Sequence, residues 1–80
     1  PTQEIDLRGQ YAEEALVHVE AFLDKAVRDG FDSVRIIHGK GTGALRTAIR
    51  DLLGRHSLAK TFASESPENG GDGATLVELI

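Results

Sequence analysis

Residues 34–53 read VRIIHGKGTGALRTAIRDLL, and they join an apolar run, a glycine-rich turn and a helical pattern in one stretch. The apolar run predicts a short β-strand that ends at His38. After the turn, apolar residues recur at three- and four-residue spacing, which predicts an amphipathic helix that stops near Gly54. Its apolar residues are Leu45, Ala48, Ile49, Leu52 and Leu53. A strand followed directly by a helix is a unit from which α/β folds are built.

The turn, residues 38–43, reads HGKGTG and alternates three glycines with a histidine, a lysine and a threonine. Glycine allows another molecule to approach the backbone closely, and a helix N-terminus offers unpaired N–H groups to phosphate. We expect Thr42 to be the N-cap of the helix. Lys40 adds a cation, and His38 can donate or accept a proton near neutral pH. Lys40 is followed by Gly41 rather than by Ser or Thr, so the turn is not a nucleotide-binding P-loop.

The chain before this stretch shows the same alternation of strand and helix. Residues 5–8 alternate apolar and polar side chains and are followed by Gly9, which predicts a strand with one buried side. Residues 10–29 have an apolar stripe of helical period, with Glu13 and Glu14 in the first turn, where the helix dipole favours negative charge. Gly30 is the expected C′ residue of this helix.

The chain after the stretch predicts a hairpin. Residues 58–64 and 75–80 read as two further strands, and the residues between them, 65–73, are all turn formers. The predicted order is therefore strand, helix, strand, helix, strand, strand, and right-handed crossovers place both helices on one face of the sheet. We expect an α/β fold: a two-layer sandwich with a four-stranded mixed sheet, mostly parallel, with one antiparallel strand from the hairpin. The other sheet face stays partly open, and the strand order is not determined by the sequence.

Composition describes a single small domain, residues 1–80, with a net charge of −4. The charge is uneven, because residues 35–60 hold six basic residues and one acidic residue. Such a local excess can attract a polyanion, although a solvated helix face is an equally good reading. The chain has no cysteine, which excludes disulfides and thiolate zinc sites and suits a cytoplasmic location. No apolar run is long enough to span a bilayer, so we expect no membrane partner. The chain begins at Pro1 and contains no methionine, so we expect it to be a C-terminal piece of a longer protein.

Polar side chains gather where the first two predicted strands end. In α/β sheets, ligands bind beyond the carboxyl ends of the parallel strands, so Asp6, Arg8, His38 and Lys40 are candidate catalytic residues. Leu7 is expected to point to the helices, and Asp6 and Arg8 away from them. Phosphodiester cleavage needs a general acid or base, a role that suits His38, and cations that stabilise the phosphoryl oxygens, a role that suits Lys40 and Arg8. Asp6 is expected to orient a base or to hold a metal. We expect His38 and Lys40 to face Asp6 and Arg8 across a backbone phosphate.

Other readings of the same residues remain open. Asp6 and Arg8 can form an ordinary surface ion pair, the glycines can serve only a tight turn, and His38 can lack any chemical role. Arg46 and Arg50 lie four residues apart on the second helix, where they can extend a phosphate track or belong to a solvated face. The glycines of the hairpin turn, Gly70, Gly71 and Gly73, are expected to serve the turn geometry, and contact of this loop with the ligand is the alternative.

Three segments together resemble the motifs of the Smr (small MutS-related) domain family, in order and spacing. They are Ile5-Asp6-Leu7-Arg8-Gly9, His38-Gly39-Lys40-Gly41-Thr42-Gly43 and Gly70-Gly71-Asp72-Gly73-Ala74-Thr75-Leu76-Val77. The resemblance covers essentially the whole chain. It is strongest to the Smr domain at the C-terminus of bacterial MutS-related, recombination-suppressing proteins. Many stand-alone family members have histidine where Arg8 stands, so a mechanism that relies on that histidine does not transfer to this chain.

The resemblance implies a fold like the C-terminal domain of translation initiation factor three. It implies an endonuclease that nicks DNA with little sequence preference, including branched recombination intermediates, in DNA repair or the suppression of recombination. It places Asp6 and Arg8 in the first motif, and His38, Gly39, Lys40 and Gly41 in the second. The expected nucleic-acid-binding residues are Arg8, Gly39, Lys40, Gly41, Thr42, Gly43, Arg46 and Arg50. An ATPase portion of the parent chain, with oligomerisation through it, is implied as well.

Two points stay open in this reading. Metal dependence varies in the family; Mg²⁺ is a candidate cofactor, although no dense carboxylate cluster requires a two-metal site. The competing hypothesis is a non-catalytic module that binds DNA, RNA or the ribosome, since some Smr proteins are linked to RNA cleavage or stalled ribosomes. A third hypothesis is a module that binds only other proteins.

Overall fold

The computed structural model describes residues 2–80 and has the predicted order of elements. The strands are β1 (Thr2–Asp6), β2 (Ser33–Ile37), β3 (Ala59–Ser64) and β4 (Ala74–Leu79), and the helices are α1 (Ala12–Arg28) and α2 (Ala44–Gly54). The first strand was expected to reach Arg8 but ends at Asp6. The connection from β3 to β4 was expected to be all turn, and it contains two short 3₁₀ turns, η1 (Pro67–Asn69) and η2 (Gly71–Gly73). Neither helix within residues 2–80 is long and apolar enough to cross a membrane.

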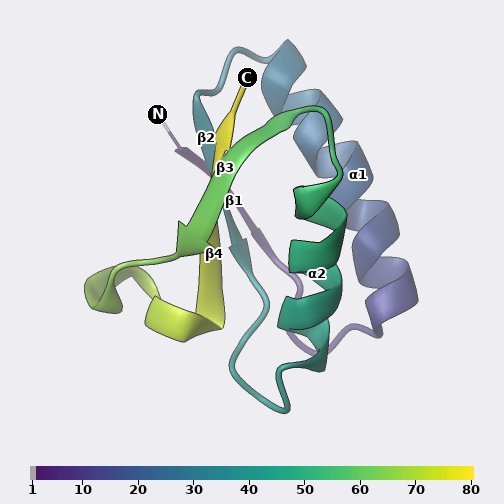
Figure 1. Cartoon of the computed structure of the whole chain (residues 1–80), viewed down its shortest axis with the longest axis vertical. Coiled ribbons are helices and arrows are strands. Elements are labelled where there is room, and N and C mark those ends of the chain that lie inside the picture. Colours follow the sequence, from purple (N-terminus) through teal and green to yellow (C-terminus); the bar gives the residue numbers. More distant parts are fainter. Residues whose placement is uncertain (1) are drawn as a thin grey trace.

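The four strands form one sheet in the order β1-β2-β4-β3. β1 pairs with β2 in parallel, and β4 runs antiparallel to both of its neighbours, β2 and β3. The last strand of the chain is thus inserted into the middle of the sheet. Both helices cover the same face of the sheet (Figure 1). The predicted two-layer α/β fold with a mixed sheet is confirmed.

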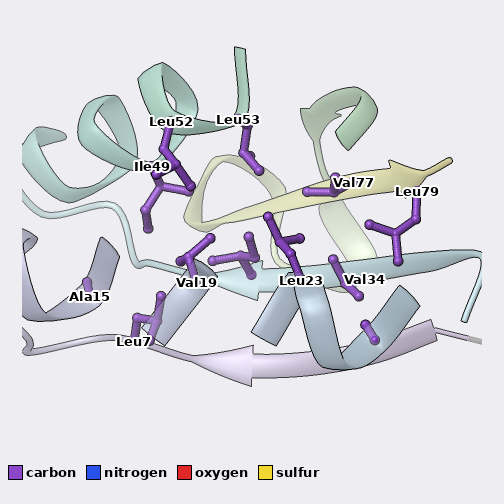
Figure 2. Packing of buried hydrophobic residues seen from close by; sticks show 12 residues of the cluster. Leu7, Ala15, Val19, Leu23, Val34, Ile49, Leu52, Leu53, Val77 and Leu79 are labelled. Atoms are coloured by element: carbon purple, nitrogen blue, oxygen red, sulfur yellow. The ribbon is translucent and has the colours of Figure 1, made fainter. Parts of the chain in front are cut away.

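The core lies between the helices and this covered face (Figure 2). On the sheet side its fully buried residues are Leu7, Val34, Ile36 and Val77, and on the helix side they are Ala15, Val19, Leu23 and Ile49. Each buried aliphatic side chain contributes about 1.5–3 kcal/mol relative to an exposed one. Because side chains alternate across a strand, burying Leu7 against the helices turns Asp6 and Arg8 to the open face, as predicted.

The C-terminal end of α1 leads into β2 through a glycine. At the end of α1, Gly30 occupies C′ with φ +83°, and its N–H donates to the Val27 carbonyl, while the Phe31 N–H donates to the Ala26 carbonyl. This is a Schellman motif, so the predicted C′ glycine is confirmed.

The predicted N-cap of α2 is wrong by one residue. The N-cap is Gly43, with φ 85°, a left-handed conformation that costs glycine little and threonine much more. The Thr42 hydroxyl accepts a hydrogen bond from the Ala44 N–H at 3.3 Å, so it still satisfies one free N–H group of the helix.

On the open face, Arg35 joins three segments of the chain. Its Nε donates to the buried Glu65 carboxylate at 2.6 Å, and its Nη1 donates to Glu4 of β1 at 2.9 Å. The second oxygen of Glu65 accepts from the Ser66 N–H at 2.9 Å. The hydrogen bond from Arg35 holds the pKa of Glu65 below its usual range. This cluster fixes the start of the connection that carries η1 and η2.

Glu65→Gln is expected to lower the free energy of unfolding at neutral pH by about 2 kcal/mol, because hydrogen bonds to charged groups contribute about that much. The folded-state pKa is depressed, so this contribution is present above the ordinary value of about 4.5 and declines as the pH falls through the folded-state pKa. Urea denaturation at neutral and acid pH measures it. Glu68→Gln, an exposed neighbour, is the matched control, and equal stability of the two variants at neutral pH would contradict the assignment.

Candidate nucleic-acid interface

The glycine-rich turn lies at the edge of the sheet where β1 and β2 end, next to the start of α2 and to η2 (Figure 1). The backbone N–H groups of His38 and Gly39 both donate to the Gly73 carbonyl, at 3.1 and 2.9 Å. A Cβ on Gly73 would lie 3.6 Å from Cγ of Lys40 and 3.7 Å from Cα of Gly39. The turn before β4 therefore supports the glycine-rich turn directly.

Asp6 and Arg8 form a two-pronged ion pair at this edge. Arg8 Nε lies 3.0 Å from Asp6 Oδ1, Nη2 lies 2.6 Å from Oδ2, and the Arg8 backbone N–H also donates to Oδ1. The side-chain hydrogen bond from Arg8 lowers the pKa of Asp6 to about 2, and the same bond raises the pKa of Arg8. The surface ion pair that was left open as an alternative is present, and it holds the plane of the Arg8 guanidinium in one orientation.

His38 is buried, with 5% of its surface exposed. Its Nδ1 donates to the Gly39 carbonyl at 2.8 Å, because a carbonyl can only accept. Its Nε2 lies 2.8 Å from the Thr75 hydroxyl, which donates to it when the ring is neutral. Burial lowers the pKa of His38, and the charges of Arg50 and Arg46 lower it further, against the hydrogen bond to Gly39. The ring is therefore neutral at pH 7, with its proton on Nδ1.

A hydrogen-bonded network continues from this ring to the second helix. Thr75 is fully buried, and its hydroxyl also accepts from Arg50 Nε at 3.3 Å. Arg50 Nη2 donates to Ser64 of β3 at 2.9 Å. Sequence reasoning missed Thr75, although a polar residue on the side of a strand that otherwise carries only apolar residues, here Val77 and Leu79, is a detectable signal.

Two hollows flank the glycine-rich turn. The smaller, of about 170 Å³, lies over the start of α2, and its lining includes His38, Arg46 and residues 39–43. The larger, of about 530 Å³, lies toward the open face, and its lining includes Arg8, Ile37 and Asn69. Lys40 and Gly39 border both hollows.

The predicted site residues therefore fall into two groups at one edge of the sheet. Arg8, paired with Asp6, shares the larger hollow with Lys40. His38 and Arg46 belong to the smaller one with Gly41, Thr42 and Gly43.

The sequence predicted that His38 faces the Asp6–Arg8 pair, and this prediction is wrong. Ile36 of β2 is buried in the core, and His38 bonds Thr75, which pairs with Ile36 in the sheet and so shares its face. Asp6 and Arg8 point to the opposite face of the sheet.

The two predicted arginines of α2 differ. A Cβ on Gly43 would lie 3.5 Å from Arg46 Nη2, so Arg46 reaches back to the turn. Arg50 is half-buried and is engaged by Thr75 and Ser64.

The residues at this edge do not form a carboxylate metal site. Among residues 2–80, no group of three or more His, Asp or Glu side chains is placed to hold a metal ion. The one carboxylate among the predicted site residues, Asp6, is occupied by Arg8.

Comparisons with known proteins find matches to both the sequence and the fold of the chain. The family model described as the Smr domain matches residues 5–80. The crystal structure of the Smr domain of Thermus thermophilus MutS2 is 46% identical, with a TM-score of 0.96 and 98% of each chain covered. YdaL, a stand-alone small MutS-related protein from Escherichia coli, is 30% identical with a TM-score of 0.90, covering 95% of this chain and 63% of that chain.

A curated relative is much longer than this chain. The endonuclease MutS2 of Ligilactobacillus salivarius is 53% identical over 73 residues, which are 91% of this chain. The match spans only 9% of that relative.

His38 is expected to titrate below the ordinary value of about 6.5, and nitrogen NMR of the ring at neutral pH is expected to show the proton on Nδ1. Because folding lowers the pKa of His38, its contribution to the free energy of unfolding is constant above about pH 6.5. The free energy of unfolding then decreases as the pH drops from about 6.5 toward the folded-state pKa. Denaturation of the wild type, His38→Gln and the exposed control His18→Gln at several pH values measures the pH-dependent contribution of His38 to the free energy of unfolding. A ring that is protonated at pH 7 would contradict the assignment.

Proposed function

The chain belongs to the Smr domain family, and we propose that it nicks the phosphodiester backbone of DNA, with little sequence preference, as one domain of a MutS2-like protein. The observation that supports this proposal is the meeting of cations and backbone N–H groups at one edge of the sheet. Lys40, Arg8 and Arg46 border the two hollows around the turn. The start of α2 adds the unpaired N–H groups of its first turn.

In this proposal the backbone crosses the glycine-rich turn at Lys40. A phosphate of the strand lies over the start of α2, where Arg46 and the N–H groups neutralise its charge. Lys40 and Arg8 stabilise the charge that develops on the phosphoryl oxygens during cleavage. Asp6 acts by orienting the Arg8 guanidinium rather than by removing a proton, since both of its oxygens accept from Arg8 and a pKa of about 2 makes the carboxylate a weak base.

His38 contributes by holding the turn through the Gly39 carbonyl. A role as general base requires that Nε2 release the Thr75 hydroxyl, because both ring nitrogens are engaged. Neutral imidazole is the protonation state that such a base needs at pH 7. Thr75 and Arg50 are then positioning residues for His38.

The second candidate is a non-catalytic module that binds DNA, RNA or the ribosome. One observation favours it: His38 and Asp6, the candidate proton acceptors, are both bonded to neighbouring protein groups. Binding alone needs only the cations and the N–H groups of the turn.

The wider roles are proposals of the same kind. We place the activity in DNA repair or the suppression of recombination, on branched intermediates, in the cytoplasm of a bacterial cell. An ATPase portion of the parent chain would provide oligomerisation.

Nicking of supercoiled plasmid by the 80-residue domain tests the leading proposal. The 80-residue domain has its own hydrophobic core. The crystal structure of the Thermus Smr domain is a chain of about the same extent, since the match covers 98% of each chain. Lys40→Ala is expected to slow nicking about a hundredfold, by analogy with the loss of one charge-stabilising donor. Lys60→Ala, at the other end of the sheet, is the matched control.

Parallel reactions with and without chelator, and with His38→Ala purified identically, exclude a contaminating nuclease. Nicking by Lys40→Ala at the wild-type rate would contradict the site. Absence of nicking by the wild type, with binding intact, would favour the binding module.

Salt dependence of binding tests the phosphate contacts separately. Lys40→Ala and Arg46→Ala are each expected to reduce the slope of log affinity against log salt by about 1, because each removes one phosphate contact. Fluorescence anisotropy with labelled DNA at several salt concentrations measures the slope. Lys60→Ala is expected to leave it unchanged, and equal slopes for all three variants would exclude this edge as the interface.

A further inference from the structure

The larger hollow is lined by residues that binding of a nucleic-acid phosphate backbone does not require. Its floor is Ile37 of β2 and Ala74 of β4, which are direct partners in the sheet and lie on the open face. Its volume of about 530 Å³ falls in the range of small-molecule sites. A phosphate alone needs neither an apolar floor nor this much space.

We propose that this hollow, hereafter the nucleotide pocket, binds one unpaired base of the substrate strand. Its defining residues are Arg8, Ile37, Lys40, Asn69 and Ala74. The proposal rests on the proposed function, because it takes the adjoining backbone to lie on the glycine-rich turn.

The walls of the nucleotide pocket match the two faces and the edge of a base. The plane of the Arg8 guanidinium is fixed by Asp6, and a planar guanidinium stacks on an aromatic ring. Ile37 and Ala74 offer an apolar surface. The Asn69 amide donates its Nδ2–H to the Ser66 hydroxyl at 3.0 Å, which leaves the amide oxygen to accept from an amino group at the base edge.

Two glycines, Gly39 and Gly70, allow close contacts around the nucleotide pocket that a larger residue would prevent. A Cβ on Gly39 would lie 3.3 Å from Cγ of Arg8, and a Cβ on Gly70 would lie 3.0 Å from Cβ of Ala74. Both glycines also have positive φ, at 78° and 118°. Glycine at these positions therefore lets Arg8 lie against the turn and lets η1 approach β4.

Lys40 connects the nucleotide pocket to the phosphate-binding side. It borders both hollows, which meet at the glycine-rich turn. A nucleotide whose phosphate lies over the start of α2 can therefore place its base on the other side of the turn. Bases inside a duplex are stacked and paired and must be extruded at a cost to reach such a pocket. The geometry favours strands with unpaired nucleotides: single strands, gaps and branch points.

The test compares two single strands of equal length and charge: labelled oligodeoxythymidylate and the same backbone with abasic sites in place of bases. Fluorescence anisotropy is expected to show about tenfold tighter binding of the base-bearing strand, within the range for one base held in a protein pocket. An oligouridylate arm shows whether the pocket accepts RNA as well as DNA.

Gly73→Leu tests the location of the base. The φ of Gly73 is not in the left-handed region, and its Cβ would be in ordinary contact with Lys40, so a leucine there fills the pocket mouth without backbone strain. We expect it to bring the affinities of the base-bearing and the abasic strand to the same value; because the added side chain also contacts Lys40, the ratio of the two affinities is the readout rather than the affinity itself. Gly54→Leu, where an added Cβ meets nothing within 4 Å, is the matched control.

Asn69→Ala, at an exposed position, tests the contact with the base edge independently if Gly73→Leu does not fold. It is expected to weaken binding of oligodeoxycytidylate, which carries an amino group, more than binding of oligodeoxythymidylate. Equal affinity of the wild type for abasic and base-bearing strands overturns the nucleotide pocket but leaves backbone binding in place. Failure to bind either strand overturns the proposed function itself.

Discussion

The Gly73 carbonyl and the two N–H groups that donate to it, from His38 and Gly39, hold the functional edge together. These bonds join a turn from the middle of the chain to a turn near its end, and they exist because β4 is inserted next to β2. Without them the glycine-rich turn would keep only the strand before it, the helix after it and the side-chain hydrogen bonds of His38. The larger of the two hollows depends on the same arrangement, since Gly73 borders it.

The alternation of side chains across β2 divides the chemistry of this edge into two halves. The core side carries a neutral, buried histidine tied to Thr75 and, through it, to Arg50 of the second helix. The open side carries a charged pair, Asp6 and Arg8, that is exposed to solvent. A buried neutral imidazole and an exposed ion pair suit different tasks: the first positions a backbone segment, and the second meets a charged ligand. Lys40, at the border, belongs to both halves.

Local patterns were sufficient for much of this structure. The burial of Leu7 with Asp6 and Arg8 turned outward follows from strand alternation alone, and the Schellman motif at Gly30 follows from a glycine after a helical stripe. The N-cap of α2 was misplaced by one residue, because the position is decided by the left-handed backbone conformation at Gly43, φ 85°, which the residue types alone do not reveal. The site was predicted only in part: its residues were at the right edge of the sheet, but His38 was assigned to the wrong face.

The sequence by itself determined the elements, the α/β sandwich, the family and the set of charged residues at one edge, because these depend on periodicity and on motifs that are contiguous in the chain. Only the tertiary structure decided the strand order and the partners of each polar group. Thr75 lies 37 residues after His38 in the chain, and nothing local to either residue indicates that they meet. Their contact follows from the position of β4 in the sheet, and that position is selected by the packing of the whole core rather than by any single segment.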